Sequence, residues 1–223
     1  MKLAIIADIH GNRPALEAVL KAAPPVDGWI CAGDVVGYYP DVNDVCEILL
    51  SLRALVVRGN HDAYVSKELA PNEERAAAYR TDWTRNQLEP QHAHWISSLP
   101  VEMVFCFGPR RLKVRHASPW DEETYLYPDS ARLADIRLTA NEYLLLGHTH
   151  RPMRIAAGEG YVINPGSVGQ PRDYIPAASY AILDVESGTV EHRRAVYDVA
   201  SYQQYLRDLG WPEATISILS RTR

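Results

Sequence analysis

Short apolar runs, each followed at once by polar residues, recur along the chain, and the first of them lies at its start. Residues 3–7 are wholly apolar and contain two Ile, a pattern typical of a strand buried on both faces in an α/β sheet. Asp8 and His10 follow two residues apart, so an extended backbone would direct both side chains to the same side. Because open α/β sheets carry their binding crevices at the carboxyl ends of strands, we expect a functional site here.

The first half of the chain alternates predicted strands with predicted helices. Pro14 begins a helix with apolar residues at Leu16 and Val19, and Pro24 and Pro25 stop it. The other elements predicted in this half are strands over 29–32 and 55–57 and helices over 41–50, 72–88 and 92–99.

The second half is predicted to consist mostly of strands. Residues 101–107 and 111–116 are rich in strand formers, and Gly108 and Pro109 between them indicate a hairpin. A last helix is expected over 198–210. Further strands are predicted over 143–146, 153–157, 161–163, 180–185 and 190–197.

Together these elements predict an α/β (α+β) fold in which one domain spans residues 1–223. We expect a four-layer αββα sandwich, with two mixed β-sheets packed face to face and helices outside. The first sheet should be largely parallel and the second mixed or antiparallel, because strands alternate with helices only in the first half of the chain.

Composition narrows the classes of partner. A formal net charge of -5 argues against a broad surface for bulk nucleic acid. The opening run has no small-residue cleavage pattern, so we do not expect a signal peptide, and no run has the length of a membrane helix. Cys31, Cys46 and Cys106 lie far apart and are expected to be reduced core residues. We therefore expect a cytoplasmic protein with no membrane partner, while a homo-oligomer stays open.

Candidate metal ligands follow the predicted strands. They are carboxylates, an amide and imidazoles, and no thiolate is among them. Such oxygen and nitrogen donors suit a catalytic site for Mn, Fe, Zn, Ni or Co better than a structural zinc site. If the strand ends meet at one rim, these side chains gather there. The positions are Asp8 and His10, Asp34, Asn60 and His61, His116, and His148 and His150.

The order and spacing of these residues resemble the calcineurin-like metallophosphoesterase superfamily, specifically its small stand-alone prokaryotic phosphoesterases and phosphodiesterases. The similarity covers roughly residues 2–173. The motifs are Asp8-x-His10, Gly33-Asp34, Gly59-Asn60-His61-Asp62, His116, Gly147-His148-x-His150 and Asn164-Pro165-Gly166-Ser167. The resemblance implies one metal ion held by Asp8, His10, Asp34 and His150, and a second held by Asp34, Asn60, His116 and His148, with Asp34 bridging the two.

The implied cofactors are two divalent or trivalent transition-metal ions. Two such ions about 3.5–4 Å apart can share a bridging hydroxide, because coordination lowers the pKa of water from 15.7 towards about 7. The same ions neutralise the phosphate oxygens of a small phosphate-ester substrate during attack.

The resemblance also gives His61 a catalytic role, either in stabilising the transition state or in protonating the leaving alkoxide. In an extended backbone its side chain should point away from the ion that Asn60 binds and still lie near the cleft. Asn12, Arg58 and Arg172 are weaker candidates for substrate contacts, and a turn or surface-charge role suits each of them equally well.

Two positions depart from family patterns. Ala117 follows His116 where the family usually has Gly, so the backbone is less free there, and a weakened second metal site stays open. Tyr38 lies four residues after Asp34 rather than three. The tyrosine ligand of the purple acid phosphatases therefore does not fit, and a tyrosinate–iron site is not expected.

We expect a metal-dependent phosphoric ester hydrolase that prefers phosphodiesters to monoesters. The diester preference rests on the resemblance and on the few Arg or Lys residues near the motifs that would hold a monoester's extra charge. The alternatives are a catalytically silent binding scaffold, like the phosphoesterase-like retromer subunit, and a nucleotide or dinucleoside polyphosphate hydrolase. Scaffold members typically lose ligands, and none is missing here. The acidic balance disfavours a nuclease.

Overall fold

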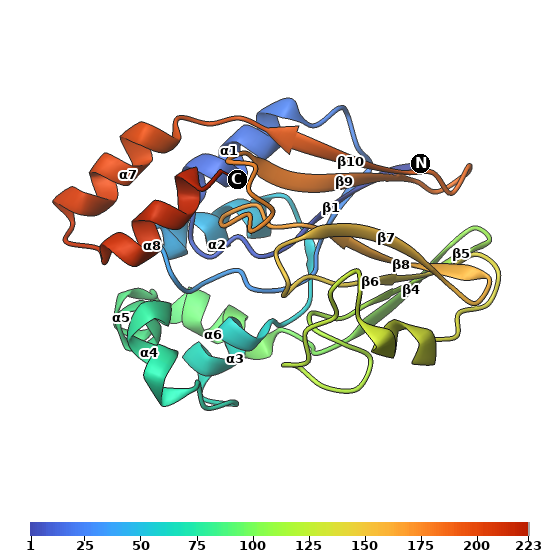
Figure 1. The fold of residues 1–223 in the computed structure, drawn as a ribbon, viewed down its shortest axis with the longest axis horizontal. Coiled ribbons are helices and arrows are strands. Elements are labelled where there is room, and N and C mark those ends of the chain that lie inside the picture. The colour runs from blue at the N-terminus through green and yellow to red at the C-terminus, as the bar shows by residue number, and fades with distance from the viewer. Residues whose placement is uncertain (223) are drawn as a thin grey trace.

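Two five-stranded β-sheets form the centre of the protein (Figure 1). The computed structural model describes residues 1–222, so the last position of the predicted domain lies outside the described residues. The strand order is β10-β9-β1-β2-β3 in the first sheet and β4-β5-β6-β8-β7 in the second. Side chains from both sheets share one buried cluster, so the sheets pack face to face. The predicted fold class is confirmed.

The first sheet is mixed rather than largely parallel. Its strands β1, β2 and β3 pair in parallel, as predicted, but β9 lies antiparallel on the other side of β1, and β10 pairs antiparallel with β9. A short turn joins β9 to β10, and such a turn can connect only antiparallel neighbours. The strands are β1 (Lys2–Ile6), β2 (Gly28–Cys31), β3 (Leu55–Val56), β9 (Ala178–Asp184) and β10 (Val190–Ala195).

The second sheet is mixed, as predicted. Its three central strands β5, β6 and β8 run parallel, and both edge strands are antiparallel to their neighbours. Cys106 is exposed on the edge strand β4, so its prediction as a core residue was wrong. The strands are β4 (Met103–Phe107), β5 (Arg110–Val114), β6 (Glu142–Leu145), β7 (Pro152–Ala157) and β8 (Gly160–Pro165).

Strand β1 is buried on both faces, which confirms the reading of its apolar run. Leu3 and Ile5 point into the layer between the two sheets, whereas Ala4 and Ile6 face the helices on the other side. Successive side chains of a strand alternate between faces, so only an uninterrupted apolar run fills both layers.

Different elements cover the outer faces of the two sheets. Helices α1 (Arg13–Ala22) and α2 (Val42–Ser51) cover the first sheet, where they share a buried cluster with β1, β2, β9 and β10. On the second sheet, residues 126–138 perform this role and include the short 3-10 helix η1 (Ala131–Asp135). One outer layer is therefore helical, and the other is mainly a loop. The second helical layer expected for the αββα sandwich is reduced here to η1.

Two helix predictions need correction. The helix expected over 72–88 is divided into α4 (Glu73–Tyr79) and α5 (Thr81–Gln87), because Arg80 adopts a left-handed backbone with φ 57°. Residues 60–66 form the helix α3 (Asn60–Ser66), which was not predicted. The remaining helices are α6 (Pro90–Ser98), α7 (Val199–Asp208), α8 (Glu213–Ser217) and the 3-10 turn η2 (Ile218–Ser220).

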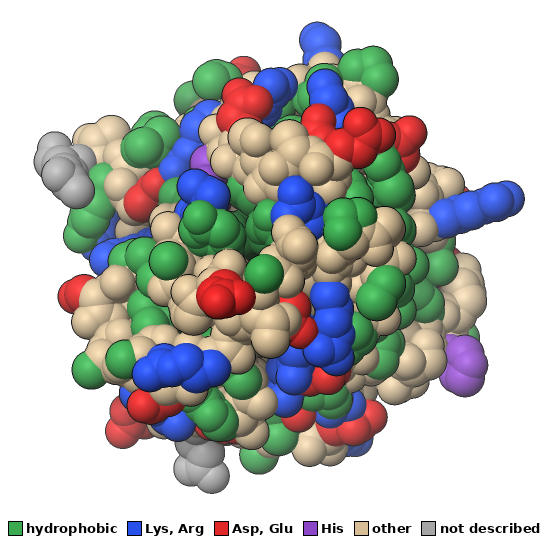
Figure 2. All heavy atoms as spheres, turned by 90° about the vertical axis from the view of Figure 1, so that its right-hand side faces the viewer, with side chains coloured by type: hydrophobic (Ala, Val, Ile, Leu, Met, Phe, Trp, Pro, Cys, Tyr) green, Lys and Arg blue, Asp and Glu red, His purple; other side chains and the backbone are tan. Residues whose placement is uncertain are grey.

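Among the described residues, no helix has the length and apolar character needed to cross a bilayer. Figure 2 shows one face of the molecule, on which Lys and Arg side chains are interspersed with acidic and hydrophobic ones. Seen from this side, positive charge is not gathered into one continuous patch.

Candidate metal centre

The candidate ligands lie just beyond the carboxyl ends of strands from both sheets. Asp8 and His10 follow β1, and Asp34 follows β2, whereas the ligands after β5 and β6 come from the second sheet. All seven are buried, and none is more than 4% exposed. The ligands from the second sheet are His116, His148 and His150, and Asn60 begins α3 after β3.

Left-handed backbone, and not extended backbone, presents most of these ligands. Asp8 and His10 have φ angles of 54° and 53°, so the expectation of extended geometry there was wrong. Asp34, His148 and His150 also have φ between 55° and 68°. Their strands therefore bend sharply as they end, and the bends bring the ligands together. One ligand atom from each of Asp8 and His10 still lies within 4.8 Å of the other.

The first group of ligands is Asp8, His10, Asp34 and His150, whose ligand atoms all lie within 4.8 Å of one another. Nε2 of His10 lies only 3.1 Å from Nε2 of His150. The Nδ1 atoms of the two rings face the backbone carbonyls of Val36 and Gln170 at 3.2 and 2.7 Å. If each Nδ1 carries the proton, the two Nε2 atoms present lone pairs to each other.

A cation would resolve this contact between acceptors. Two lone pairs at 3.1 Å repel, and Oδ2 of Asp8 is buried without a hydrogen-bond partner among the described residues. Metal-binding histidines commonly donate their second ring N–H to a carbonyl, as both rings do here. The first group therefore fits a metal ion.

The second group consists of Asp34, His116 and His148, together with Asn60. Asp34, His116 and His148 have ligand atoms within 4.8 Å of one another. Asn60 Oδ1 lies 3.1 Å from Nε2 of His116 and 2.9 Å from Nδ1 of His148. The other ring nitrogens face backbone carbonyls: Nδ1 of His116 lies 2.7 Å from Ala32 O, and Nε2 of His148 lies 3.0 Å from Glu123 O. Asp34 belongs to both groups, as a bridging ligand would.

The charges in the site depend on one another. Burial raises the pKa of Asp8 to about 7. Burial also disfavours ionisation of Asp34, but the neighbouring His116 outweighs it and holds the pKa of Asp34 well below its usual value. Burial likewise opposes protonation of His116, yet the Asp34 carboxylate, 3.2 Å from Nε2, raises the pKa of that ring to about 9. His116 and Asp34 therefore form an ion pair across the site.

Burial keeps the other histidines neutral. It lowers the pKa of His148 to about 3 and holds those of His10 and His150 well below their usual values. Neutral imidazole is the form that binds metal ions. Three of the four candidate histidine ligands are thus ready to coordinate at neutral pH.

His61 lies beside the two groups and is enclosed by aromatic rings. It is the second residue of α3, so its backbone is helical and the extended geometry expected for it was wrong. The ring centroids of His10 and Tyr38 are each 4.8 Å away, and that of Tyr79 is 4.5 Å away. Burial lowers the pKa of His61 to about 4. Its backbone N–H donates to Oδ1 of Asp34 at 2.9 Å, which ties this residue to the bridging carboxylate.

The three residues predicted to contact substrate lie in different surroundings. The Asn12 side chain is fully buried and caps α1 by accepting from Ala15 N–H at 3.1 Å. Its amide donates to Gly169 O at 2.9 Å, so its polar atoms already have partners. Arg58 forms ion pairs with Glu122 at 3.0 Å and with Glu68. Substrate contact through either residue would require these bonds to break.

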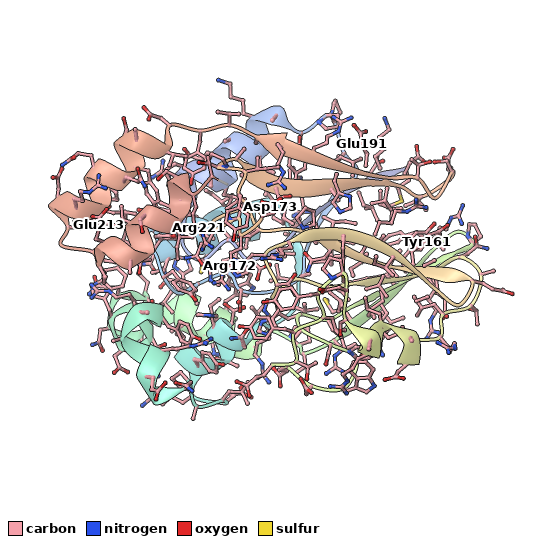
Figure 3. The ribbon with its side chains drawn as sticks, viewed as in Figure 1. Tyr161, Arg172, Asp173, Glu191, Glu213 and Arg221 are labelled. Carbon is pink, nitrogen blue, oxygen red and sulfur yellow. The ribbon has the colours of Figure 1, made fainter. Side chains whose placement is uncertain are left out.

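Arg172 differs because its contacts are neutral. It lies near the centre of the view in Figure 3, in the loop between β8 and β9. The guanidinium donates to Gln170 Oε1 at 2.7 Å and to Tyr38 Oη at 3.2 Å. Its positive charge lowers the pKa of the Asp8 carboxyl, although this effect is smaller than those of burial and of the nearer charges. Of the three, Arg172 is the one available to an anion at the site.

The sequence motifs did not reveal the role of Asp62. Its carboxylate accepts backbone N–H groups from Asp34, Val35, Val36 and Gly59 at 2.9–3.1 Å. Asp62 thereby shapes the turn that presents the bridging ligand. The sequence did carry one indication of this role. Asp62 lies three residues after Gly59, the N-cap residue of α3, and an acidic residue at that position commonly caps a helix.

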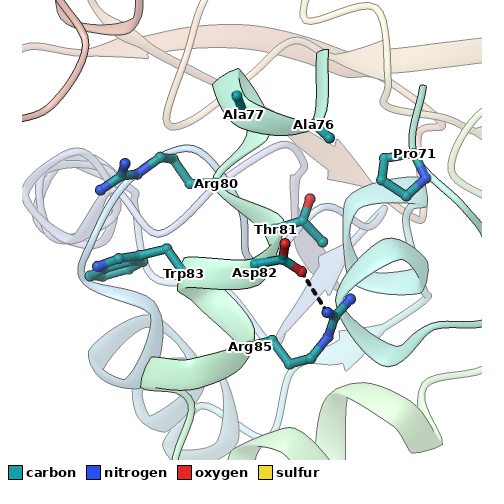
Figure 4. Close-up of a pocket in the computed structure, with 8 residues that line it drawn as sticks. All are labelled: Pro71, Ala76, Ala77, Arg80, Thr81, Asp82, Trp83 and Arg85. Atoms are coloured by element: carbon teal, nitrogen blue, oxygen red, sulfur yellow. Dashed lines mark hydrogen bonds and ion pairs between the residues drawn. The ribbon is translucent and has the colours of Figure 1, made fainter. Parts of the chain in front are cut away.

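A separate cavity of about 430 Å³ lies beside α4 and α5 (Figure 4). Arg85 crosses its lower side and pairs with Asp82 at 2.7 Å. No candidate metal ligand lines this cavity, so it is distinct from the metal centre. Its lining residues are Pro71, Ala76, Ala77, Arg80, Thr81, Asp82, Trp83 and Arg85.

Comparison with known proteins establishes the family. The calcineurin-like phosphoesterase superfamily domain matches residues 1–188, so the chain belongs to this superfamily. It is therefore of the phosphoesterase class of hydrolases, with a buried Asp and His cluster that can bind metal.

Several relatives match over most of their length. An uncharacterized protein of Methanocaldococcus jannaschii is 32% identical in an alignment of 227 positions that covers 92% of each chain. The phosphodiesterase YfcE of Escherichia coli is 30% identical in an alignment of 198 positions that covers 82% of this chain and 88% of that protein. The crystal structure of a metallophosphoesterase from Sphaerobacter thermophilus has a TM-score of 0.83 and 34% identity, and covers 99% of this chain and 98% of its own.

Proposed function

We propose that this protein is a phosphodiesterase that uses two metal ions. The observation that carries the proposal is the sharing of Asp34 between two groups of buried nitrogen and oxygen ligands. A carboxylate with two oxygens can serve two ions at once, whereas Asn60 adds a neutral oxygen that limits the build-up of negative charge. Mn, Fe, Zn, Ni and Co all suit this donor set.

The chain's own residues would divide the remaining work. When bound, the metal ions would lower the pKa of a water molecule and neutralise the phosphate oxygens. His61, neutral at pH 7 and beside both ligand groups, would donate a hydrogen bond to a phosphoryl or leaving-group oxygen. Arg172 would bind a non-bridging phosphate oxygen through its guanidinium.

The preference for diesters has two supports. The relative YfcE is named a phosphodiesterase. In addition, Arg58 is neutralised by Glu68 and Glu122, which leaves Arg172 as the predicted substrate contact with an uncommitted positive charge. A phosphodiester carries one negative charge and a monoester nearly two at neutral pH, so a site with little added positive charge favours the diester.

A nucleotide or dinucleoside polyphosphate hydrolase is the second candidate. Its support is Tyr125, which is 37% exposed and whose ring stacks on His148 at 3.8 Å between centroids. Tyr127 lies parallel to it at 5.8 Å. An exposed aromatic ring beside a phosphate site can stack with a nucleobase. In either case we propose a small phosphate ester as the natural substrate. We also propose that the protein is cytoplasmic.

The test is activity of protein loaded with each of the five metals in turn. An aryl phosphodiester should be hydrolysed with at least one ion, and faster than the matching monoester. Asp34→Asn should lose metal and turnover together, while Asp129→Asn, in an exposed loop, should keep both. Absence of turnover with every ion, together with partner binding that survives Asp34→Asn, would identify a scaffold. Faster hydrolysis of the monoester would contradict the diester preference alone.

A further inference from the structure

The loop formed by residues 117–125, which follows His116, contacts His148 at two places on its ring. The backbone carbonyl of Glu123 faces Nε2 of His148 at 3.0 Å. Two residues further along, the Tyr125 ring stacks on the same imidazole, with an angle of 28° between the planes. The loop thus contacts both the edge and the face of one candidate ligand.

The contact with Glu123 decides which nitrogen of His148 carries the proton. A carbonyl oxygen can only accept, so Nε2–H is the donor and Nδ1 keeps its lone pair. That lone pair points at the second ligand group, where Nδ1 lies 2.9 Å from Oδ1 of Asn60. If the loop moved away, the proton could shift to Nδ1 and the ring could rotate, and His148 would lose its prepared state as a ligand.

Side chains of Arg58 and Tyr64, on either side of Asn60 in the sequence, tie this loop to the start of α3. Arg58, immediately before Gly59 and Asn60, forms a forked contact with both carboxylate oxygens of Glu122, at 3.1 and 3.3 Å. Tyr64 of α3 donates its hydroxyl hydrogen to Oε1 of Glu123 at 2.6 Å. The Arg58–Glu122 ion pair is partly buried, because the Arg58 side chain is 9% exposed and that of Glu122 is 20% exposed. Water therefore screens this pair less than it screens a surface pair.

The loop is also compact in itself. Asp121 accepts backbone N–H groups from Glu123 and Thr124 at 3.0 and 2.6 Å, and the Thr124 hydroxyl at 2.7 Å. Ser118 Oγ accepts the N–H of Asp121 at 3.0 Å. These bonds brace the loop internally, and the ties to Arg58 and Tyr64, together with the bond from Arg115 to Pro119 O at 2.8 Å, hold the Glu123 carbonyl in its place.

We propose that Glu122 and Glu123 are positioning residues for the second metal site. Their bonds to Arg58 and Tyr64 hold the loop where the Glu123 carbonyl fixes the tautomer of His148, and so raise the affinity of the ion bound by the second group. This inference rests on the proposed two-metal function. It assigns Arg58 a positioning role in place of the substrate contact expected from the sequence.

Arg58 supplies a matched control. It pairs with both Glu68 and Glu122, but only Glu122 lies on the loop. Glu68→Ala removes a charge and an ion pair of the same arginine and leaves the loop attached. Glu123→Gln supplies the conservative variant, because its amide oxygen can still accept from Tyr64, whereas Glu123→Ala cannot. Neither substitution at 123 removes the backbone carbonyl that contacts His148.

The experiment is a titration of metal-free protein with Co²⁺, followed by visible absorption. Wild type should fill two sites. Glu122→Ala/Glu123→Ala should bind the second ion about 10–100-fold more weakly and the first unchanged, the range typical for loss of a partner that orients a ligand. Glu68→Ala should match wild type, and Glu123→Gln should recover most of the affinity lost in Glu123→Ala. Thermal melts confirm that each variant is folded.

A second readout follows the tautomer itself. Nitrogen-15 NMR of the histidine rings should show His148 protonated on Nε2 in wild type and a mixture of tautomers in the double alanine variant. Wild-type affinity and an unchanged His148 tautomer in that variant would overturn the positioning role. A wild-type protein that fills only one site would instead contradict the two-metal proposal, so the two failures are distinguishable.

Discussion

Metal binding at this site should release protons, most of them from His116. Burial opposes protonation of that ring, but the Asp34 carboxylate raises its pKa to about 9. At pH 7 the ring is therefore about 99% protonated, and Nε2 must lose its proton before it can coordinate. Burial raises the pKa of Asp8 to about 7, so that carboxyl is about half protonated at the same pH.

The ligand side chains should thus release about 1.5 protons at pH 7, about 1 from His116 and about 0.5 from Asp8, and any proton lost from metal-bound water would add to this number. His10, His148 and His150 contribute almost none, because burial has already lowered their pKa values. Because metal binding releases protons, a lower proton concentration favours binding. The affinity for metal should therefore rise with pH. Affinity should increase about tenfold per pH unit between 7 and 9 and level off above 9.

The measurement is isothermal titration calorimetry with Mn²⁺ in non-chelating buffers of different ionisation enthalpy. The slope of the observed enthalpy against the buffer enthalpy gives the number of protons released. Repeating the titration at pH 9.5 is the internal control, since release from His116 should fall to about 0.25 proton there and release from Asp8 to near zero. Release near zero at pH 7, or an affinity that does not change between pH 7 and 9, would refute the His116–Asp34 ion pair.

Three further predictions concern the residues around the site. Replacing His61 with Ala should leave the metal content unchanged and lower kcat by about 10²–10⁴, as steady-state rates and elemental analysis of the same sample will show. Gly37 has φ 95°, and an added Cβ would lie 2.8 Å from His61 Nδ1; Gly37→Ala should therefore displace the ring and reduce turnover, whereas equal rates would contradict this contact. Asp62→Asn replaces an acceptor of four backbone N–H groups with a side chain that itself donates, and should destabilise the fold by about 3 kcal/mol, lowering the Tm by roughly 6–12 °C; a Tm within 2 °C of wild type would count against it.

Local patterns were sufficient to predict most of the elements. The run over residues 3–7 predicted a strand buried on both faces because no polar residue interrupts it, and β1 is such a strand. The direction of β9 could not be predicted, since nothing in its sequence tells whether it joins β1 in parallel or antiparallel. The break at Arg80 was hidden for a related reason, because an arginine in the left-handed region gives no local signal.

The candidate ligands were predictable because each one immediately follows a strand, and strand ends meet at one edge of a sheet. Their left-handed backbone was not, because Asp and His are not glycine and the motif alone reads as a continued strand. The role of Glu123 was also hidden. Its contact with His148 uses a backbone carbonyl, which every residue type carries, and the two residues are separated by 25 positions.

The left-handed conformation of five candidate ligands lowers the stability of the fold. Each non-glycine residue held at positive φ costs about 1–2 kcal/mol, and the pairs of lone pairs that face one another add repulsion. Replacing Asp8 by Asn would relax one of these turns, keep the side-chain volume and remove a carboxylate whose Oδ2 has no partner among the described residues, so this variant should resist heat better while losing metal. Work to raise the thermal stability of this protein should therefore hold Asp8, His10, Asp34, His148 and His150 constant.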